Sequence, residues 1–221
     1  MKKLFFLTSC RIHRPFNCDK KHRNGKYNLY DCLNTNWSEN NFLGRLYESN
    51  YILQTLKYLI NKDIENKDNI QVITPQKNMD KKHFLDICDT LMKADIIIIE
   101  IATIKYFMNN NIYLSNEHFN KLGIYPTKSG KLNKKELINN ILEIEKLVND
   151  IGKKVLFVTH FNFQNIPNRK LIIECVKNTA KYFFDPSCVI NSYRKLSDRN
   201  HYTTKTEVEI MEKIHKCLSI M

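Results

Sequence analysis

The sequence predicts an α/β fold with a doubly wound, mainly parallel sheet of five strands and helices on both faces. Short apolar runs alternate with helical patterns along the chain, and this alternation is typical of parallel sheets. Residues 96–99 are four consecutive isoleucines, as expected for a central strand that is buried on both faces. A chain of 221 residues is long enough for one sizeable core, so we expect a single domain.

Five runs rich in β-branched and aromatic residues are candidate strands, and five segments with helical periodicity separate or follow them. The candidate strands are residues 3–8, 70–74, 95–101, 154–159 and, more weakly, 187–190. The candidate helices are residues 43–61, 81–93, 134–151, 169–184 and a last one from Thr203 or Thr204 to about Ser219.

Residues that favour helix ends stand at several of these boundaries. Asp80, Asn133 and Asn168 are expected to cap the second, third and fourth helices. Gly152 is expected to end the third. The last helix begins with Thr204-Lys205-Thr206-Glu207, which is a capping-box pattern.

Two long polar stretches, residues 11–41 and 104–132, are rich in Asn and Tyr and match no regular element. We interpret both as irregular insertions. Long insertions at the functional edge of an α/β sheet often determine substrate specificity.

The composition limits the classes of partner. The formal net charge is +12 and the hydrophobic content is 43%, but no basic stretch is interleaved with aromatics that could stack on bases, so nucleic-acid binding is not expected. No apolar run reaches the length of a membrane span. Seven cysteines without regular spacing favour a reducing compartment over a secreted disulfide scaffold, and we expect a cytoplasmic protein.

The N-terminus offers an alternative to that localisation. Leu7-Thr8-Ser9-Cys10 after two lysines imitates a bacterial lipoprotein signal. However, the apolar stretch covers only residues 4–7, which is shorter than the h-region of about 7–15 residues in signal peptides. A mature protein that begins at Cys10 would overturn the cytoplasmic prediction.

Candidate catalytic residues stand at the two ends of the chain. Asp198 precedes His201 by three residues, just before the last helix, a spacing that lets a carboxylate orient an imidazole as a general base. The first strand leads directly to Ser9 and Cys10. Alternation along a strand implies that one of these two faces the pocket.

Of these two, Cys10 is the preferred nucleophile and Ser9 the alternative. A thiol needs less activation than a hydroxyl, and the cationic neighbours Arg11 and His13 favour a thiolate. The structural alternative is that Cys10 is a small buried residue at a strand end. In the same way, His201 could be an ordinary polar residue of a turn.

Further side chains are expected at the C-terminal edge of the sheet, where ligands of such folds bind. The amide of Gly44 and the hydroxyl of Thr103 are candidate oxyanion donors. The alternative is that Gly44 is an ordinary loop glycine and Thr103 an ordinary strand-end residue. His160 and Asn162 follow the fourth strand in the chain, residues 154–159. We expect them either to contact substrate or to form hydrogen bonds with backbone groups of their loop. Arg11, His13 and Arg14 would bind an acidic or polar part of the substrate.

No cofactor is required by these residues. Cys10-x-x-His13 and Cys18-x-x-x-His22 could supply metal ligands, but they lack the paired CxxC spacing of structural zinc sites. No metal is therefore expected. Neither a GxGxxG nor a Walker-type glycine loop occurs, which disfavours a nucleotide site of that kind.

These motifs resemble the SGNH (GDSL-like) hydrolase superfamily, which has a flavodoxin-like sheet. Asp198-Arg199-Asn200-His201 matches the family's last block without a gap. Thr8-Ser9-Cys10 stands where the family has Gly-Asp-Ser, and is more similar to branches that begin with Gly-Ser-Cys, such as the GSCFA group. Gly44 is a weak match to the second block. Glu100-Ile101-Ala102-Thr103 replaces the expected Gly-x-Asn-Asp, so either Thr103 substitutes for the asparagine donor or the oxyanion hole is degraded.

The resemblance implies an acyl-ester hydrolase or O-acyltransferase, with a carbohydrate as a possible substrate. Cys10 would attack the acyl carbonyl, His201 would transfer the proton, and Asp198 would orient His201. Acyl-coenzyme A would be the donor if the enzyme is a transferase. The alternative is a catalytically decayed SGNH-fold module that binds a glycan or a protein partner. The sequence indicates no oligomeric state.

Overall fold

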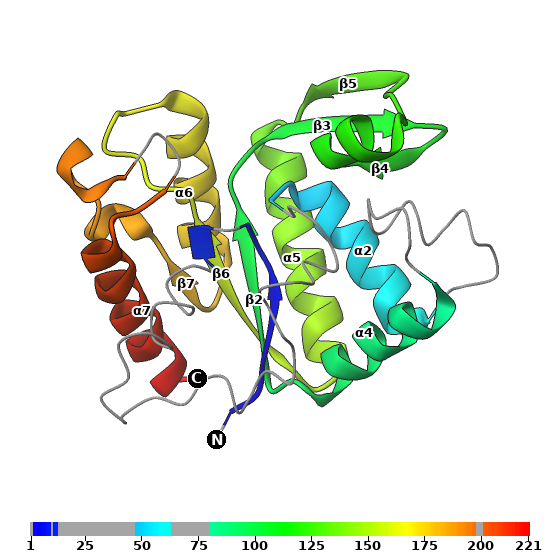
Figure 1. Ribbon diagram of the computed structural model, residues 1–221, viewed down its shortest axis with the longest axis horizontal. Helices are drawn as coiled ribbons and strands as arrows, with labels where there is room; N and C mark the ends of the chain where they lie inside the picture. Colours follow the sequence, from blue (N-terminus) through cyan, green and yellow to red (C-terminus); the bar gives the residue numbers. More distant parts are fainter. Residues whose placement is uncertain (1, 10, 13–46, 63–79, 198–200) are drawn as a thin grey trace.

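The chain forms a mixed α/β fold around a four-stranded parallel sheet (Figure 1). The computed structural model describes residues 2–9, 11–12, 47–62, 80–197 and 201–221. The strands are β1 (Leu4–Leu7), β2 (Ile96–Ile101), β6 (Lys154–Thr159) and β7 (Phe183–Phe184). Their order across the sheet is β1-β2-β6-β7, with every neighbouring pair parallel.

The isoleucine run is the centre of this sheet, as predicted. Leu4 to Leu7 pair with Ile96 to Ile99 on one side of β2, and β6 pairs along the whole of β2 on the other. All six residues of β2 are buried. Unbroken β-branched residues suit this position because both faces of the strand contact apolar side chains.

Helices cover both faces of the sheet. One face packs against α2 (Ser49–Asn61), α4 (Lys81–Lys93), α5 (Lys134–Asp150) and α6 (Pro167–Thr179). The other face packs against α7 (Thr204–Ser219). Figure 1 shows α7 on one side of the sheet and α2, α4 and α5 on the other. Alternate residues of β2 contribute to the two cores: Ile97 and Ile99 to the first, Ile96 and Ile98 to the second.

Two of the predicted caps are confirmed. Asp80 Oδ1 accepts a hydrogen bond from the His83 amide at the start of α4. Asn133 and Glu136 form a reciprocal capping box at the start of α5. Gly152, with φ of +73°, lies just beyond the end of α5, where a left-handed conformation favours glycine.

Other predicted boundaries are wrong by a few residues. Asn168 does not cap α6, which begins at Pro167 after Ile166, because proline fits the first turn of a helix and needs no hydrogen bond there. The cap of α7 is Thr203, whose hydroxyl accepts from the Thr206 amide, so the cap lies one residue before the Thr204 of the predicted capping box.

The helix predicted to begin at residue 43 begins later in the structure. Residues 43–46 lie outside the described part, Glu48 has an extended backbone, and α2 begins at Ser49.

The end of the sheet differs from the prediction. Residues 187–190 do not form a strand; Pro186–Cys188 is a short 3₁₀ helix whose first turn is capped by Asp185. The edge strand is instead Phe183–Phe184, which was assigned to the end of a helix, whereas α6 stops at Thr179. The candidate strand at residues 70–74 lies outside the described residues.

The stretch 104–132, predicted to be irregular, contains a second sheet. It is antiparallel with the order β4-β3-β5, and its strands are β3 (Lys105–Asn109), β4 (Ile112–Leu114) and β5 (Lys128–Lys131). A short π-helix, His118–Leu122, lies between β4 and β5. Asn110 and Asn111 make the β3–β4 turn with φ of 47° and 64°, and asparagine tolerates this left-handed conformation. Of the stretch 11–41, the structure describes residues 11 and 12.

Candidate functional site

A buried ion pair lies just beyond the C-terminal end of β1. Glu100, on β2, is 1% exposed. Its Oε2 accepts a hydrogen bond of 2.7 Å from the Ser9 amide. Its Oε1 accepts one of 3.0 Å from Arg11 Nε and lies 2.9 Å from Arg11 Nη2. Glu100 therefore holds the two residues that flank Cys10 in the sequence, while Cys10 itself lies outside the described residues.

Ser9 and Arg11 are also joined to each other and to the next residue. Ser9 Oγ accepts a hydrogen bond of 3.3 Å from the Arg11 amide. The Ser9 carbonyl accepts one of 3.1 Å from the Ile12 amide. Because Ser9 is 2% exposed and its hydroxyl is engaged in this turn, the geometry gives Ser9 a structural role at the strand end.

His160 lies at the end of β6 and is 5% exposed. Its Nδ1 is 3.1 Å from the Phe161 carbonyl oxygen, which can only accept, so the neutral ring carries its proton on Nδ1 and leaves Nε2 as an acceptor. Burial, and then the nearby Arg11 and Arg169, lower the pKa of His160 to about 3. His160 is therefore neutral at physiological pH, which suits a hydrogen-bond acceptor rather than a base.

Arg169, on α6, is a second cation at this edge that the sequence analysis did not select. Its Nη1 donates a 3.1 Å hydrogen bond to the Phe161 carbonyl, and its guanidinium lies 5.2 Å from the centre of the Phe161 ring. Burial and Arg11 lower the pKa of Arg169. Among the described residues of this edge, Arg11 and Arg169 outnumber the carboxylate of Glu100, and guanidinium groups suit an acidic or strongly polar ligand group.

His201 lies in a turn that packs against the same loop. Leu196 pairs with Tyr202 as an antiparallel bridge, and the Ser197 amide donates to the His201 carbonyl at 2.9 Å. The Tyr202 ring is 6.0 Å from that of Phe161. The turn therefore places the backbone of His201 beside the loop that carries His160. Asp198, which follows Ser197 in the sequence, lies outside the described residues.

The remaining predicted residues divide into three groups. Asn162 stabilises the loop in which it lies. Its side-chain Oδ1 accepts a hydrogen bond of 2.7 Å from the Ile166 backbone amide, and its backbone amide donates one of 2.8 Å to Ser187 Oγ. Thr103 lines a separate pocket, described next. The other predicted site residues lie outside the described part of the chain: Cys10, His13, Arg14, Gly44 and Asp198.

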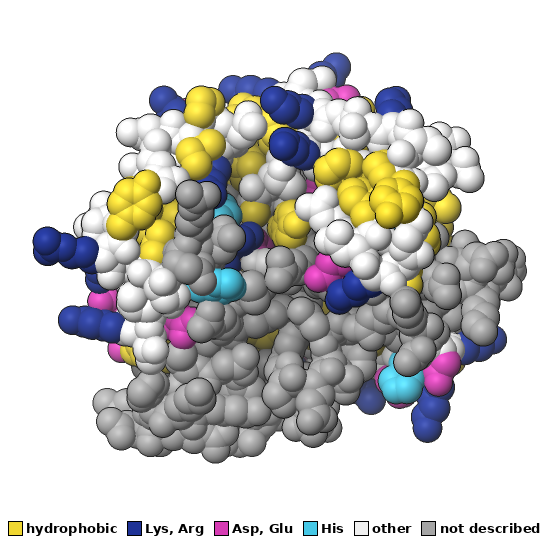
Figure 2. Space-filling model, turned by 45° about the horizontal axis from the view of Figure 1, so that its top comes forward, with side chains coloured by type: hydrophobic (Ala, Val, Ile, Leu, Met, Phe, Trp, Pro, Cys, Tyr) yellow, Lys and Arg dark blue, Asp and Glu magenta, His cyan; other side chains and the backbone are white. Residues whose placement is uncertain are grey.

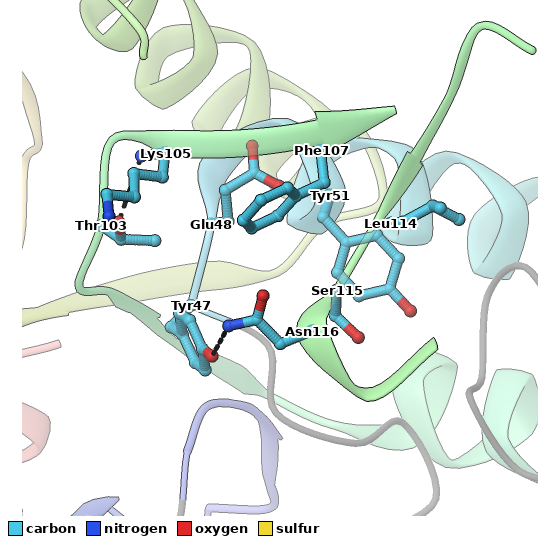
Figure 3. A pocket seen from close by; sticks show the side chains of 9 residues that line it. All are labelled: Tyr47, Glu48, Tyr51, Thr103, Lys105, Phe107, Leu114, Ser115 and Asn116. Atoms are coloured by element: carbon cyan, nitrogen blue, oxygen red, sulfur yellow. Dashed lines mark hydrogen bonds between the residues drawn. The ribbon is translucent and has the colours of Figure 1, made fainter. Parts of the chain in front are cut away.

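That separate pocket has a volume of about 140 Å³ and lies between the start of α2 and the small sheet (Figure 3). Its walls include Tyr47, Glu48, Tyr51, Thr103, Phe107 and Asn116. The Thr103 hydroxyl accepts a hydrogen bond of 3.1 Å from the Lys105 amide. Ser9, Arg11, Glu100 and His160 do not line this pocket, so Thr103 belongs to a different group of side chains.

Glu48 is the unusual residue of this pocket. It is 6% exposed, and neither carboxylate oxygen has a hydrogen-bond partner among the residues that the structure describes. Burial raises the pKa of Glu48 to about 8, and the nearby amides of Asn50 and Tyr51 oppose this increase. Sequence reasoning missed Glu48 because a glutamate before a helix is ordinary in a sequence, and its burial depends on the distant small sheet.

Figure 2 looks onto the C-terminal edge of the main sheet and shows histidine and basic side chains in a hollow beside the grey atoms.

Within the described ranges, no group of three or more His, Cys, Asp or Glu side chains could hold a metal ion. The helices in those ranges also include none that is long and apolar enough to cross a membrane.

Comparisons with protein-family models, curated proteins and solved structures find no match to this chain. The fold and the site define a mixed α/β protein with a basic, histidine-containing site at the C-terminal edge of its parallel sheet.

Proposed function

We propose that this protein is an enzyme that transfers or hydrolyses acyl esters, with Cys10 as nucleophile, His201 as general base and acid, and Asp198 as the residue that orients His201. The observation that carries the proposal is the double contact of Glu100 with Ser9 and Arg11. A nucleophile needs a fixed position relative to its substrate, and Glu100 anchors both chain neighbours of Cys10.

The local charge also supports a cysteine nucleophile. The guanidinium of Arg11 is held at the end of β1 by Glu100, and a neighbouring cation favours the thiolate over the thiol. Ser9 is the weaker candidate because it is 2% exposed and its hydroxyl accepts from the Arg11 amide.

The two histidines of this edge suit different roles. A pKa of about 3 makes His160 a poor base at neutral pH, since proton transfer is most effective when the pKa lies near the working pH. His201 is therefore the preferred base, and His160 Nε2 is left to accept a hydrogen bond from a substrate hydroxyl.

The spacing of Asp198 and His201 has a counterpart elsewhere in the chain. Asp80 and His83 are also three residues apart; Asp80 caps α4, His83 lies in its first turn, and the carboxylate Oδ1 lies 2.9 Å from His83 Nδ1, whereas His201 precedes the Thr203 cap of α7. An Asp-x-x-His turn in this protein can therefore join the two side chains. The exposed pair at α4 also provides a matched control for experiments.

In the proposed reaction His201 takes the proton of Cys10 while the sulfur bonds to the acyl carbon. The tetrahedral intermediate then collapses, the bond to the alcohol oxygen breaks, and His201 returns the proton to that oxygen. Water, or the hydroxyl of an acceptor, attacks the thioester after losing its proton to His201, and the Cys10 thiolate leaves. Gly44 remains the predicted oxyanion donor, because Thr103 lines the separate pocket. Arg11 and Arg169 would bind an acidic part of the substrate, such as the phosphates of an acyl-coenzyme A donor.

Alkylation with limiting iodoacetamide at pH 7 tests the nucleophile, with modified sites identified by peptide mass mapping. Cys188 is an exposed thiol whose pKa is raised by burial and by Asp185, so it serves as an internal reference. We expect Cys10 to react at least about tenfold faster than Cys188, because a lowered thiol pKa increases the thiolate fraction. His201→Ala should remove this advantage, whereas His83→Ala should preserve it.

Hydrolysis of 4-nitrophenyl acetate provides the second readout. Cys10→Ala and His201→Ala should each lower the rate to that of the uncatalysed reaction, while His83→Ala should have the wild-type rate. A Cys10 that reacts no faster than Cys188, together with full esterase activity of Cys10→Ala, would exclude the proposed mechanism.

A binding module is the second candidate, and an aromatic group on the small sheet favours it. Phe107 and Phe119 meet edge to face with ring centres 5.1 Å apart, and Phe119 stacks on Tyr125 at 6.5 Å. Tyr125 is 69% exposed. Exposed stacked rings suit the apolar face of a sugar, so glycan binding that is unchanged in Cys10→Ala and lost in Tyr125→Ala, without esterase activity, would favour this candidate.

A further inference from the structure

A groove rich in side-chain amides runs along α2, where this helix meets α5 and the turn that joins β3 to β4. Its volume is about 480 Å³, within the range of about 300–1,000 Å³ for small-molecule sites. Figure 1 shows the small sheet above α2 and α5. We call this hollow the amide groove, and its walls include Asn50, Tyr58, Asn61, Asn111, Tyr113 and Asn140.

Hydrogen bonds between elements hold the walls of the amide groove in place. Gln54 Oε1 accepts a hydrogen bond of 2.8 Å from the Tyr113 backbone amide, and Gln54 Nε2 donates one of 3.0 Å to the Tyr113 carbonyl. Asn140 Nδ2 donates to Ser49 Oγ at 2.9 Å and to Asn50 Oδ1 at 2.5 Å. Because these walls are already fixed, a ligand that binds to them orders few side chains.

Several polar groups of the amide groove are left for a ligand. The bonds of Asn140 leave Asn50 Nδ2 as a donor and Asn140 Oδ1 as an acceptor, and neither atom is among the solvent-inaccessible, unpartnered atoms of the described residues. Asn61 and Asn111 are exposed, and their side-chain amides make no hydrogen bond within the described ranges. Four amides therefore offer both donors and acceptors.

The lining carries no uncompensated charge. Lys57 lines the groove, and its Nζ lies 2.6 Å from Glu143 Oε1 on α5. No acidic side chain is among the described residues that form the walls. A charged ligand would lose hydration in this groove without gaining a counter-charge, so the walls favour a neutral and polar ligand.

Two tyrosine rings form the less polar part of the lining. Tyr58 and Tyr113 both line the groove, and the Tyr113 ring meets that of Tyr106 edge to face at 6.1 Å. Each tyrosine presents an apolar ring and a hydroxyl that donates and accepts. A pyranose has the matching chemistry, because its hydroxyls donate and accept and one face of its ring presents C–H bonds.

We propose that the amide groove binds a neutral sugar, with the amides of Asn61, Asn111 and Asn140 on its hydroxyls and the tyrosine rings against its C–H face. The site is independent of both functions proposed above. None of the residues assigned to the catalytic edge or to the exposed aromatic group lines it, namely Ser9, Arg11, Glu100, His160 and Tyr125.

Titration of the ¹⁵N-labelled chain, followed by NMR, tests the proposal with the methyl α-D-pyranosides of glucose, galactose and mannose. We expect at least one of them to cause saturable shifts of the side-chain amide signals of Asn50, Asn61 and Asn111. Cyclohexanol, a ring with a single hydroxyl, should bind at least about tenfold more weakly. Tighter binding of the α-linked trisaccharide of the same sugar would identify a glycan chain as the source, and equal binding a free sugar.

Two variants remove amides from the walls. Asn61→Ala changes the exposed last residue of α2, and Asn111→Gly changes a turn residue with φ of 64°, a conformation that suits glycine. Each should lower the affinity about threefold or more, since each removes a hydrogen bond to the ligand. Asn139→Ala, an exposed change on α5 outside the groove, should leave the affinity unchanged, as should Tyr125→Ala and Cys10→Ala.

Three results would overturn the proposal. They are the absence of saturable amide shifts with all three methyl pyranosides, an unchanged affinity in the double variant Asn61→Ala/Asn111→Gly, and binding of cyclohexanol as tight as that of the best sugar. Uridine that shifts the same signals at lower concentration than every sugar would also overturn it, and would indicate a nucleoside site instead. Loss of esterase activity in Cys10→Ala with unchanged sugar binding would separate this site from the proposed reaction.

Discussion

Glu100 makes more polar contacts at the C-terminal edge of the main sheet than any other carboxylate described there, and its replacement should lower the stability of the fold. Glu100→Gln removes the carboxylate that pairs with the Arg11 guanidinium, which is 13% exposed. Removing one partner of a buried pair typically lowers the free energy of unfolding by about 3–5 kcal/mol. We expect a loss of this size in denaturant unfolding.

An exposed pair serves as the control for Glu100→Gln. Glu143 lies 2.6 Å from Lys57 with both side chains nearly half exposed, and such pairs contribute less than about 1 kcal/mol. Glu143→Gln should therefore change the free energy of unfolding little. A loss in Glu100→Gln as small as that in Glu143→Gln would contradict the role assigned to Glu100.

His160 should make the folded state sensitive to acid. Its pKa falls from an ordinary 6.5 to about 3 in the folded state, so between these values the unfolded chain binds a proton that the folded chain does not. The stabilisation is complete above pH 6.5 and is lost as the pH falls towards 3. His160→Asn keeps a donor for the Phe161 carbonyl, and the asparagine side chain cannot be protonated in this range. The free energy of unfolding of this variant should therefore depend less on pH between 4.5 and 6.5 than that of the wild type.

Glu48 should make the folded state less stable as the pH rises, which is the opposite of the effect of His160. Its pKa is raised from 4.5 to about 8, so the folded state holds a proton that the unfolded chain has lost. This stabilisation is complete below pH 4.5 and disappears as the pH rises through 8. In urea unfolding from pH 5 to 8, Glu48→Gln should gain stability relative to the wild type as the pH rises. A constant difference between the two proteins would contradict the raised pKa.

At the scale of single elements, the capping box of α5 is the interaction that the sequence predicted best. Asn133 accepts from the Glu136 amide at 3.0 Å, and Glu136 Oε2 accepts from the Asn133 amide at 2.8 Å. Replacing such a cap by alanine typically lowers the free energy of unfolding by about 1 kcal/mol. Asn133→Ala should show this loss in thermal or denaturant unfolding.

The control for the cap lies in the same helix. Asn139 is exposed in the middle of α5, where alanine has the higher helix propensity. Asn139→Ala should therefore leave stability unchanged or raise it slightly. Equal losses of unfolding free energy in the two variants would contradict a stabilising role of the Asn133 cap.

Local chemistry explains which elements could be predicted. The strands at residues 4–7, 96–101 and 154–159 and the caps Asp80 and Asn133 follow from runs and side chains close in sequence. The small sheet at residues 105–131 was missed because its strands have only three to five residues, and its stability depends on pairing between strands. Similarly, β7 has two residues and is a strand only because β6 lies beside it.

For the whole molecule, α7 is the helix that covers one face of the sheet and follows the His201 turn. Ile214 is fully buried between this helix and the sheet residues of the second core. Ile214→Ala should lower the free energy of unfolding by about 2–5 kcal/mol, the range for large-to-small changes in a core. Lys213→Ala, an exposed change on the same helix, should have little effect. Similar unfolding midpoints for the two variants would contradict this packing of α7.

The candidate site was predictable in part. The sequence places Ser9, Arg11 and His160 at strand ends, and the structure brings them to one edge because parallel strands share their C-terminal ends. Arg169 and the partners of Glu100 could not be found in this way. Their contacts join residues 8 to about 90 positions apart, and the sequence contains no local signal for such pairing. Cys10 and Asp198 remain predictions.

The sequence by itself determined the parallel α/β core, because an uninterrupted isoleucine run and capped amphipathic helices restrict the backbone locally. The tertiary structure alone decided the chemical state of the polar side chains within that core. Glu100 is paired with Arg11, Glu48 is buried with a raised pKa, and His160 is neutral. The physical reason is that charge and protonation depend on burial and on neighbours brought together by folding, and neither is encoded in the residue type.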